Sequence, residues 1–249
     1  MISPSAFKGG TIWSVIQSVH GALQATGLAL LVLFFAAGAV KTCSTFVEMK
    51  RPEQALKIFV RFAIAKGLVT YGMELMLSLL EIAQGMLATV MTVSGEVMAD
   101  NALPESILTA IEECSLLPSI GILAISLIGM LVIVVISFIL VITVYGRMFR
   151  LYLYTAISPI PLAAFAGEPT QQIGVSFIKS YTSVCLEGVI IALCSVIYTA
   201  YAAARPDISS EASAAMQVLT YIGELVFNML VLVGLIKSAS SVTREMLGL

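Results

Sequence analysis

The feature that most constrains this chain is an apolar run from Leu117 to Tyr145 that contains no charged residue. It is longer than the roughly 20 residues with which an α-helix crosses the hydrocarbon core of a bilayer. Charged residues make up only 11% of the sequence, whereas a soluble domain usually has about 25%. The sequence therefore cannot supply a polar surface for a soluble fold of this length, and it predicts an all-α polytopic membrane protein.

Four further apolar segments are also long enough to cross a membrane. We therefore expect a bundle of about five transmembrane helices that forms one domain over residues 1–249. Residues 11–24 alternate between polar and apolar faces with helical period, so residues 1–24 are predicted to include an external, interfacial amphipathic helix leading into the first span. The first span ends near Val40. The other four cover about residues 67–93, 117–145, 174–204 and 216–236.

Residues 151–167 are short, apolar and interrupted by prolines. The sequence Ser158-Pro159-Ile160-Pro161 cannot continue a regular helix, since proline lacks the backbone N–H and its ring clashes with the preceding turn. The segment is therefore predicted to be a re-entrant or interfacial hairpin. Two roles are open for Ser158, Pro159 and Pro161: a hairpin that only turns the chain, or a gate or docking element at the inner mouth of a pore.

The Lys and Arg residues predict the orientation, because they are enriched in cytoplasmic connections. With a re-entrant hairpin, the N-terminus lies outside, the C-terminus lies inside, and only Lys8 and Arg205 of the 13 Lys and Arg residues lie outside. The connections are then a basic cytoplasmic segment (41–66), an acidic external loop (94–117) and a cytoplasmic tail (237–249). The cytoplasmic basic cluster comprises Lys50, Arg51, Lys57, Arg61 and Lys66.

Four carboxylates fall inside the predicted spans, where a charge is costly unless it faces a partner or a water-filled cavity. Glu74 and Glu81 lie two helical turns apart, and Tyr71 and Ser78 share their face. We expect this polar stripe to line a lumen or a subunit interface. Glu187 and Glu224 are each isolated on their helices, and either a functional role or a hydrogen bond between helices is open for them.

The sequence contains none of the common catalytic motifs. It has no glycine-rich nucleotide loop, no HExxH and no GxSxG. The four cysteines form no CxxC pair and have no metal-ligand spacing, so they are interpreted as packing residues. His20, the single histidine, has no second histidine or carboxylate near it in sequence and is interpreted as an interfacial side chain. We expect no enzymatic activity, no metal and no cofactor.

The region from Arg147 to Tyr198 resembles the TrbL-type polytopic inner-membrane component of type IV secretion and conjugation systems, in its short Gram-positive form. Outside this region the chain is similar only in its layout of spans and loops. The residues that carry the resemblance are Gly146, Arg147, Arg150, Tyr152, Tyr154, the stretch 156–162 (AISPIPL), Gly174, Phe177, Ile178, Lys179 and Tyr181.

The resemblance implies a channel or scaffold subunit in the bacterial cytoplasmic (inner) membrane that helps DNA and protein pass between cells. It implies a homo-oligomer, other membrane subunits and cytoplasmic ATPases of the machine as partners, with membrane lipids around it and transient contact with transferred DNA. The acidic external loop is unsuited to hold DNA, because carboxylates repel phosphate. The alternative is a secondary transporter or ion channel that uses the intramembrane carboxylates; solute flux in proteoliposomes, lost on Glu74→Gln, would favour it.

Overall fold

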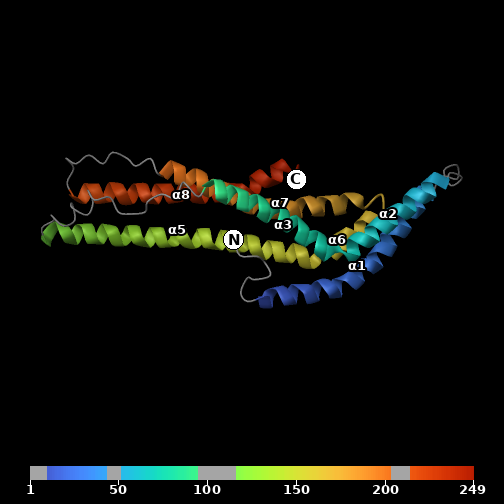
Figure 1. Ribbon diagram of the computed structural model, residues 1–249. Coiled ribbons are helices and arrows are strands. Elements are labelled where there is room, and N and C mark those ends of the chain that lie inside the picture. Colours follow the sequence, from blue (N-terminus) through green and yellow to red (C-terminus); the bar gives the residue numbers. More distant parts are fainter. Residues whose placement is uncertain (1–9, 44–51, 95–115, 203–213) are drawn as a thin grey trace. The chain divides into compact units, whose positions relative to one another are not determined.

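The computed structural model describes residues 10–43, 52–94, 116–202 and 214–249, and all regular secondary structure in these ranges is helical (Figure 1). Five helices are long and apolar enough to cross a membrane, namely α1, α3, α5, α7 and α8. This confirms the predicted all-α membrane bundle with about five spans. The helices are α1 (Thr11–Cys43), α2 (Pro52–Thr70), α3 (Gly72–Ser94), α5 (Leu116–Ile157), α6 (Pro159–Ala163), the 3-10 helix η3 (Ala164–Ala166), α7 (Gln171–Ala202) and α8 (Ala214–Met246).

The helix that carries the uncharged run extends beyond it. α5 passes through Arg147 and Arg150 and ends at Ile157, so the first part of the predicted 151–167 hairpin continues this helix. The regular hydrogen bonding of α5 stops at Ser158 because Pro159 has no N–H to donate to the carbonyl four residues earlier, while the backbone of Ser158 itself keeps αR angles (φ −52°, ψ −32°). Pro159 then begins α6, at the first helical position, where α6 itself requires no N–H donor.

α2 and α3 follow one another with a single intervening residue. α2 begins at Pro52, as expected from the proline, and ends at Thr70. Helical hydrogen bonds continue across the junction: the Tyr71 N–H donates to the Gly67 carbonyl at 2.8 Å, and the Leu75 N–H donates to the Tyr71 carbonyl at 3.0 Å. The predicted second span thus corresponds to α3 together with the last residues of α2.

The described helices divide into two compact units, and α3, α5, α7 and α8 each contribute to both. The first unit takes its residues from 1–85, 146–187 and 242–249, and its core includes the fully buried side chains of Leu31, Met76, Leu151, Leu162 and Tyr181. The second unit takes its residues from 86–145 and 188–241, and Ile191, Ile236 and Ala239 form its core with Leu140, Ile190 and Leu232 around them. Whether residues 1–249 act as a single domain stays a prediction.

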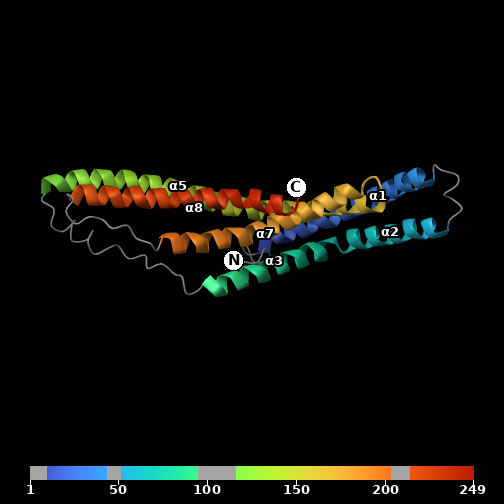
Figure 2. The same cartoon turned by 90° about the horizontal axis from the view of Figure 1, so that it is seen from above.

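In the first unit, α1 and α2 lie side by side and run in opposite directions (Figures 1 and 2). α6 and η3 pack against both of them. The rings of Phe35 on α1 and Phe62 on α2 meet edge to face, with their centroids 4.7 Å apart. The proline-containing segment is therefore enclosed by protein, as irregular backbone at membrane depth must be.

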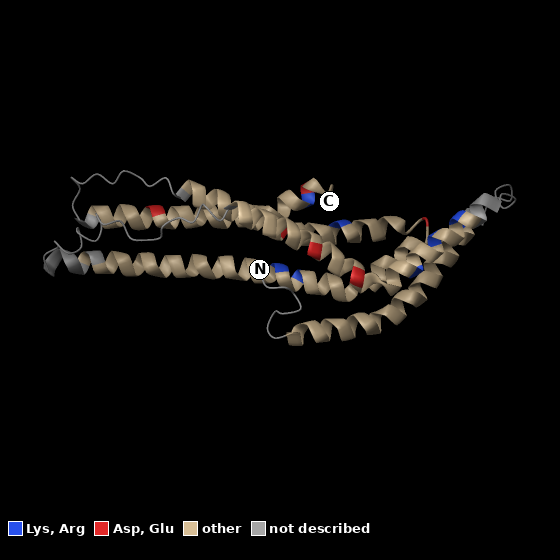
Figure 3. Cartoon of the chain, viewed as in Figure 1, with Lys and Arg blue, Asp and Glu red and all other residues tan. Residues whose placement is uncertain are grey.

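Charged side chains are sparse on the described helices (Figure 3). Large apolar side chains of α5, such as Leu127, Leu131 and Phe138, are exposed in the single chain. A row of exposed apolar residues of this length is typical of a helix that faces lipid or a neighbouring subunit.

Candidate functional site

The centre of the first unit is the break between α5 and α6 at Ser158. One face of α1 lies against this region, and its residues recur at alternating spacings of four and three, the period of a straight contact face along a helix. They are His20, Gln24, Gly27, Leu31, Phe34 and Gly38.

His20 hydrogen-bonds to the end of α5. Its Nδ1 lies 3.0 Å from the carbonyl oxygen of Thr155, and its side chain is only 5% exposed. In an unbroken helix this carbonyl would accept the N–H of the residue four positions on, but that residue is Pro159, which has none. The histidine therefore satisfies a buried carbonyl that the proline leaves without its helical donor.

Ser158 completes the arrangement. Its hydroxyl donates to the same Thr155 carbonyl at 3.0 Å, and its Oγ lies 3.3 Å from Nδ1 of His20. Since a carbonyl oxygen only accepts, the contact between His20 and Thr155 places a proton on Nδ1. Nδ1 then cannot take the proton of Ser158, so this buried pair is a structural connection and not a base with an activated nucleophile.

The junction between α2 and α3 lies beside His20 and Ser158. Nε2 of Gln24, one turn after His20 on α1, donates to the Thr70 carbonyl at 3.0 Å and to the Val69 carbonyl at 3.4 Å. A Cβ atom on Gly72 would lie 3.7 Å from His20 and 3.8 Å from the Ser158 hydroxyl. One face of α1 therefore contacts both the break at Ser158 and the junction between α2 and α3.

Two glycines of α1 permit this close approach. A Cβ atom on Gly27 would lie 2.7 Å from the Pro159 carbonyl oxygen, and one on Gly38 would lie 3.0 Å from Cα of Gly167. Backbone therefore contacts backbone at both ends of the α6–η3 segment, a distance that small residues allow in membrane helices.

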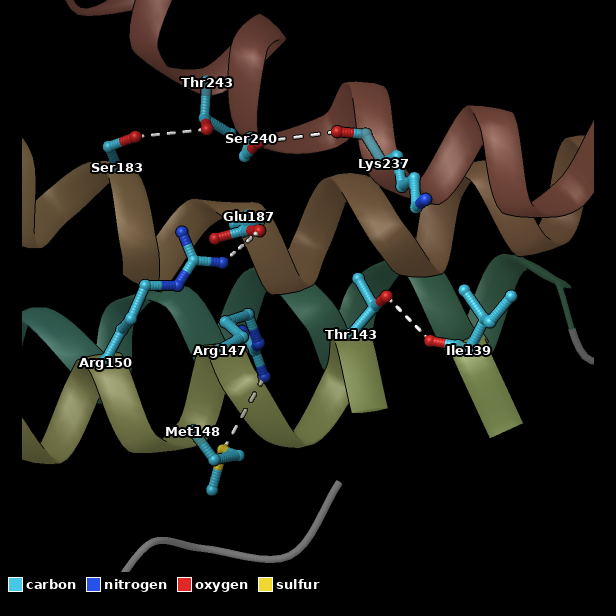
Figure 4. Close-up of polar contacts among 10 residues, drawn as sticks. All are labelled: Ile139, Thr143, Arg147, Met148, Arg150, Ser183, Glu187, Lys237, Ser240 and Thr243. Carbon is cyan, nitrogen blue, oxygen red and sulfur yellow. Dashed lines mark hydrogen bonds and ion pairs between the residues drawn. The ribbon is translucent and has the colours of Figure 1, made fainter. Parts of the chain in front are cut away.

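A second polar cluster joins α5 to α7 (Figure 4). Nη2 of Arg150 lies 2.9 Å from Oε1 of Glu187, whose side chain is 3% exposed while that of Arg150 is 47% exposed. Arg147 lies buried one turn earlier on α5. The hydroxyl of Ser183 on α7 donates to that of Thr243 on α8 at 3.1 Å. Glu187, isolated on its own helix, thus has an ionic partner on another one.

The predicted stripe on α3 has a different environment. Tyr71, Glu74, Ser78 and Glu81 are all exposed in the single chain, and Tyr71 occupies the junction with α2. Glu224 lies half-buried on α8 in the second unit. The functional roles of the four intramembrane carboxylates stay predictions.

The basic cluster is only partly described. Lys50 and Arg51 lie outside the described residues, as does most of the acidic loop 94–117. Lys57 and Lys66 are exposed on α2. Arg61 instead lies 3.7 Å from the carboxylate of Glu168, which follows η3.

The predicted hairpin residues are buried. Ser158 and Pro159 are enclosed, and Pro161 is half-buried. The interpretation of His20 as an interfacial side chain is wrong, because its ring is buried against α5. The sequence does contain a pattern that indicates this burial. His20 and Gln24 lie on the same helical face of α1 as Gly27 and Leu31, which are typical of a contact between helices. Among the described residues, no group of three or more His, Cys, Asp and Glu side chains could hold a metal ion.

The comparisons with known proteins agree with a membrane component. Residues 3–159 match the family described as TrbL/VirB6 plasmid conjugal transfer like protein. No curated protein and no solved structure matches the chain. The match covers more than half of the sequence, from before α1 to the beginning of α6. The chain is therefore a multi-pass membrane protein that belongs to the TrbL/VirB6 family of conjugal transfer components.

Proposed function

We propose that this protein is a non-enzymatic channel or scaffold subunit that helps DNA and protein substrates cross the cytoplasmic membrane during conjugation. Its membership of the TrbL/VirB6 family carries this proposal. The five candidate spans support it, because a subunit of this kind must remain in the membrane.

The exposed stripe on α3 supports assembly into a homo-oligomer. Glu74 and Glu81 lie within a candidate span and are exposed in the single chain. A carboxylate facing hydrocarbon costs several kcal/mol or becomes protonated (about 2.5–3.5 kcal/mol for Asp on insertion scales). A neighbouring copy or a water-filled lumen would remove this cost, so we place the stripe at a subunit interface or lumen.

The remaining partners follow from the same assignment. They are the other membrane subunits of the secretion machine, its cytoplasmic ATPases and, transiently, the transferred DNA. In the proposed orientation the N-terminus lies outside and the C-terminus in the cytoplasm. The proline-containing segment, clamped by α1 and α2, is then the element that docks or gates at the inner side.

Deletion of the gene tests the proposal. Transfer to recipient cells should fall to background, while nicking of the DNA at the transfer origin continues, because the protein acts after DNA processing. Restoration of transfer by the wild-type gene is the control. Normal transfer in the deletion strain would contradict the proposal.

Complementation with Glu74→Gln plus Glu81→Gln tests the stripe. These changes keep the shape of the side chains and remove the carboxylates, so we expect assembled protein with strongly reduced transfer. Glu224→Gln, a carboxylate of α8, is the matched control and should complement. Equal loss in both variants would contradict a special role of the α3 stripe.

A further inference from the structure

The helix α3 has two opposite faces within a candidate membrane span. One face is buried in the protein, and its residues are spaced by four or three positions; they are Gly72, Met76, Leu80, Ala83 and Leu87. The opposite face is exposed and carries Glu74, Ser78 and Glu81 of the α3 stripe. Gly85 extends this stripe by one turn, and it is exposed as well. The polar side of α3 is therefore turned away from the core of its own chain.

Glu81 lies deep in the span. It is about 14 Å along the helix from Gly72, where the candidate span begins, and this is near the middle of a hydrocarbon core about 30 Å thick. Glu74 and Glu81 are the only charged residues from Gly72 to Val93. Among the described residues neither forms an ion pair within its chain, since the pairs there join Arg61 to Glu168 and Arg150 to Glu187. A carboxylate at this depth needs water or a cation from outside the chain.

The symmetry of a homo-oligomer decides between dry contact and water for this stripe. Copies in one membrane have the same orientation and are related by rotation about the membrane normal, so Glu81 lies at the same depth in every copy. Stripes packed against one another without water would bring like charges together, which disfavours both charged forms. A water-filled space between the copies hydrates the carboxylates and removes this cost.

We propose that the α3 stripe lines a water-filled path through the oligomer that admits inorganic cations and excludes the DNA strand. Rings of carboxylates make a pore selective for cations, and they repel phosphate. The inference rests on the homo-oligomer proposed above and names the ions that its lumen accepts. The transferred DNA then follows another route through the machine.

Cysteine labelling in membranes of donor cells that contain the whole apparatus tests the proposal. Ser78→Cys and Gly85→Cys place a thiol one turn before and one turn after Glu81, and a Cβ atom on Gly85 would meet nothing within 4 Å. The reagents are two water-soluble methanethiosulfonates, the cationic MTSET and the anionic MTSES. Mass spectrometry measures the labelling at each position separately, so the native cysteines can remain.

We expect both cysteines to react, and to favour the cationic reagent. The preference should be about fivefold above the ratio measured on a free thiol, since nearby carboxylates attract one reagent and repel the other. Adding Glu74→Gln plus Glu81→Gln should return the ratio to that of the free thiol while labelling continues. Absence of labelling at both positions, as in a dry contact between copies, would overturn the proposal, and so would labelling without charge preference.

Leu131→Cys provides the matched control. Leu131 is the midpoint of the uncharged run on α5 and is 64% exposed in the single chain. A thiol there faces lipid or an apolar contact and should react with neither reagent; labelling equal to that at Ser78→Cys would overturn the proposal. The labelling measures water and charge beside α3, whereas the deletion strain measures transfer. A failure of this inference is therefore distinguishable from a failure of the proposed function.

Discussion

Pro159 determines which groups meet at the centre of the first unit. Its missing N–H leaves the Thr155 carbonyl without a helical donor, and His20 and Ser158 both supply one. A carbonyl buried without a donor costs more than a hydrogen bond normally contributes. The proline and the histidine are therefore energetically coupled, although 135 or more positions separate the histidine from the end of α5.

His20→Ala should destabilise the protein. The substitution removes one of the two donors to the Thr155 carbonyl and leaves Ser158 as the other, so we expect a loss of about 0.5–1.5 kcal/mol, the usual net contribution of one hydrogen bond. Thermal unfolding in detergent, followed by circular dichroism, measures the loss. Gln17→Ala, an exposed residue one turn earlier on the same helix, is the control and should unfold as the wild type does.

Gly27→Ala should also destabilise the protein, through a steric clash. The added Cβ would lie 2.7 Å from the Pro159 carbonyl oxygen, so backbone must shift, at a cost of about 1–3 kcal/mol. Gly21→Ala is the matched control, since its Cβ would meet nothing within 4 Å. Equal melting temperatures for the two variants would contradict the close contact between α1 and α6.

The local chemistry of proline made part of this site predictable. The break at Ser158 follows from the two prolines alone. The partner of Thr155 does not, because any buried donor on another helix would serve, and sequence spacing gives no information about contacts between distant segments. The interpretation of His20 failed for this reason.

At the level of helices, the apolar runs predicted the five spans, since the length of a hydrophobic segment is set by the bilayer. The ends of the helices were less predictable. α8 continues through Lys237 and Arg244 to Met246, where a polar tail was expected from residue 237. Lys and Arg are good helix formers, so a loss of hydrophobicity does not by itself end a helix.

Glu187 contributes an ion pair to the contact between α5 and α7. Glu187→Gln should remove the ion pair with Arg150 while keeping the size of the side chain, and we expect a loss of about 1.5–3 kcal/mol, the range for a hydrogen bond to a charged group. The melting temperature in detergent measures it. Glu81→Gln, an exposed carboxylate of α3, serves as the control and should leave stability unchanged in the detergent-solubilised monomer.

For the whole molecule, the orientation is the prediction that most needs a direct measurement. The distribution of Lys and Arg predicts that the C-terminus lies in the cytoplasm. A fluorescent protein fused after Leu249 should therefore be fluorescent, and alkaline phosphatase at the same position should be inactive. Active phosphatase would reverse the assignment of the acidic and basic connections.

The resemblance predicted the family, and the match over residues 3–159 confirms it. The residues that carry the resemblance lie between Arg147 and Tyr198, around the prolines, whereas the family match covers residues 3–159. The two overlap from Arg147 to Pro159, the end of α5 and the break. The N-terminal helices have an apolar composition that many membrane proteins share, and they contain no motif that indicates the family.

The donor that His20 provides also has a consequence for biosynthesis. α1 precedes α5 in the chain, so during translation the Thr155 carbonyl, the acceptor for His20, is synthesised 135 residues after the histidine. Until then the polar face of α1 must hydrogen-bond elsewhere, to water or to the insertion machinery. The contacts of α1 with Thr155 and Pro159 can therefore form only after the break at Ser158 has been synthesised.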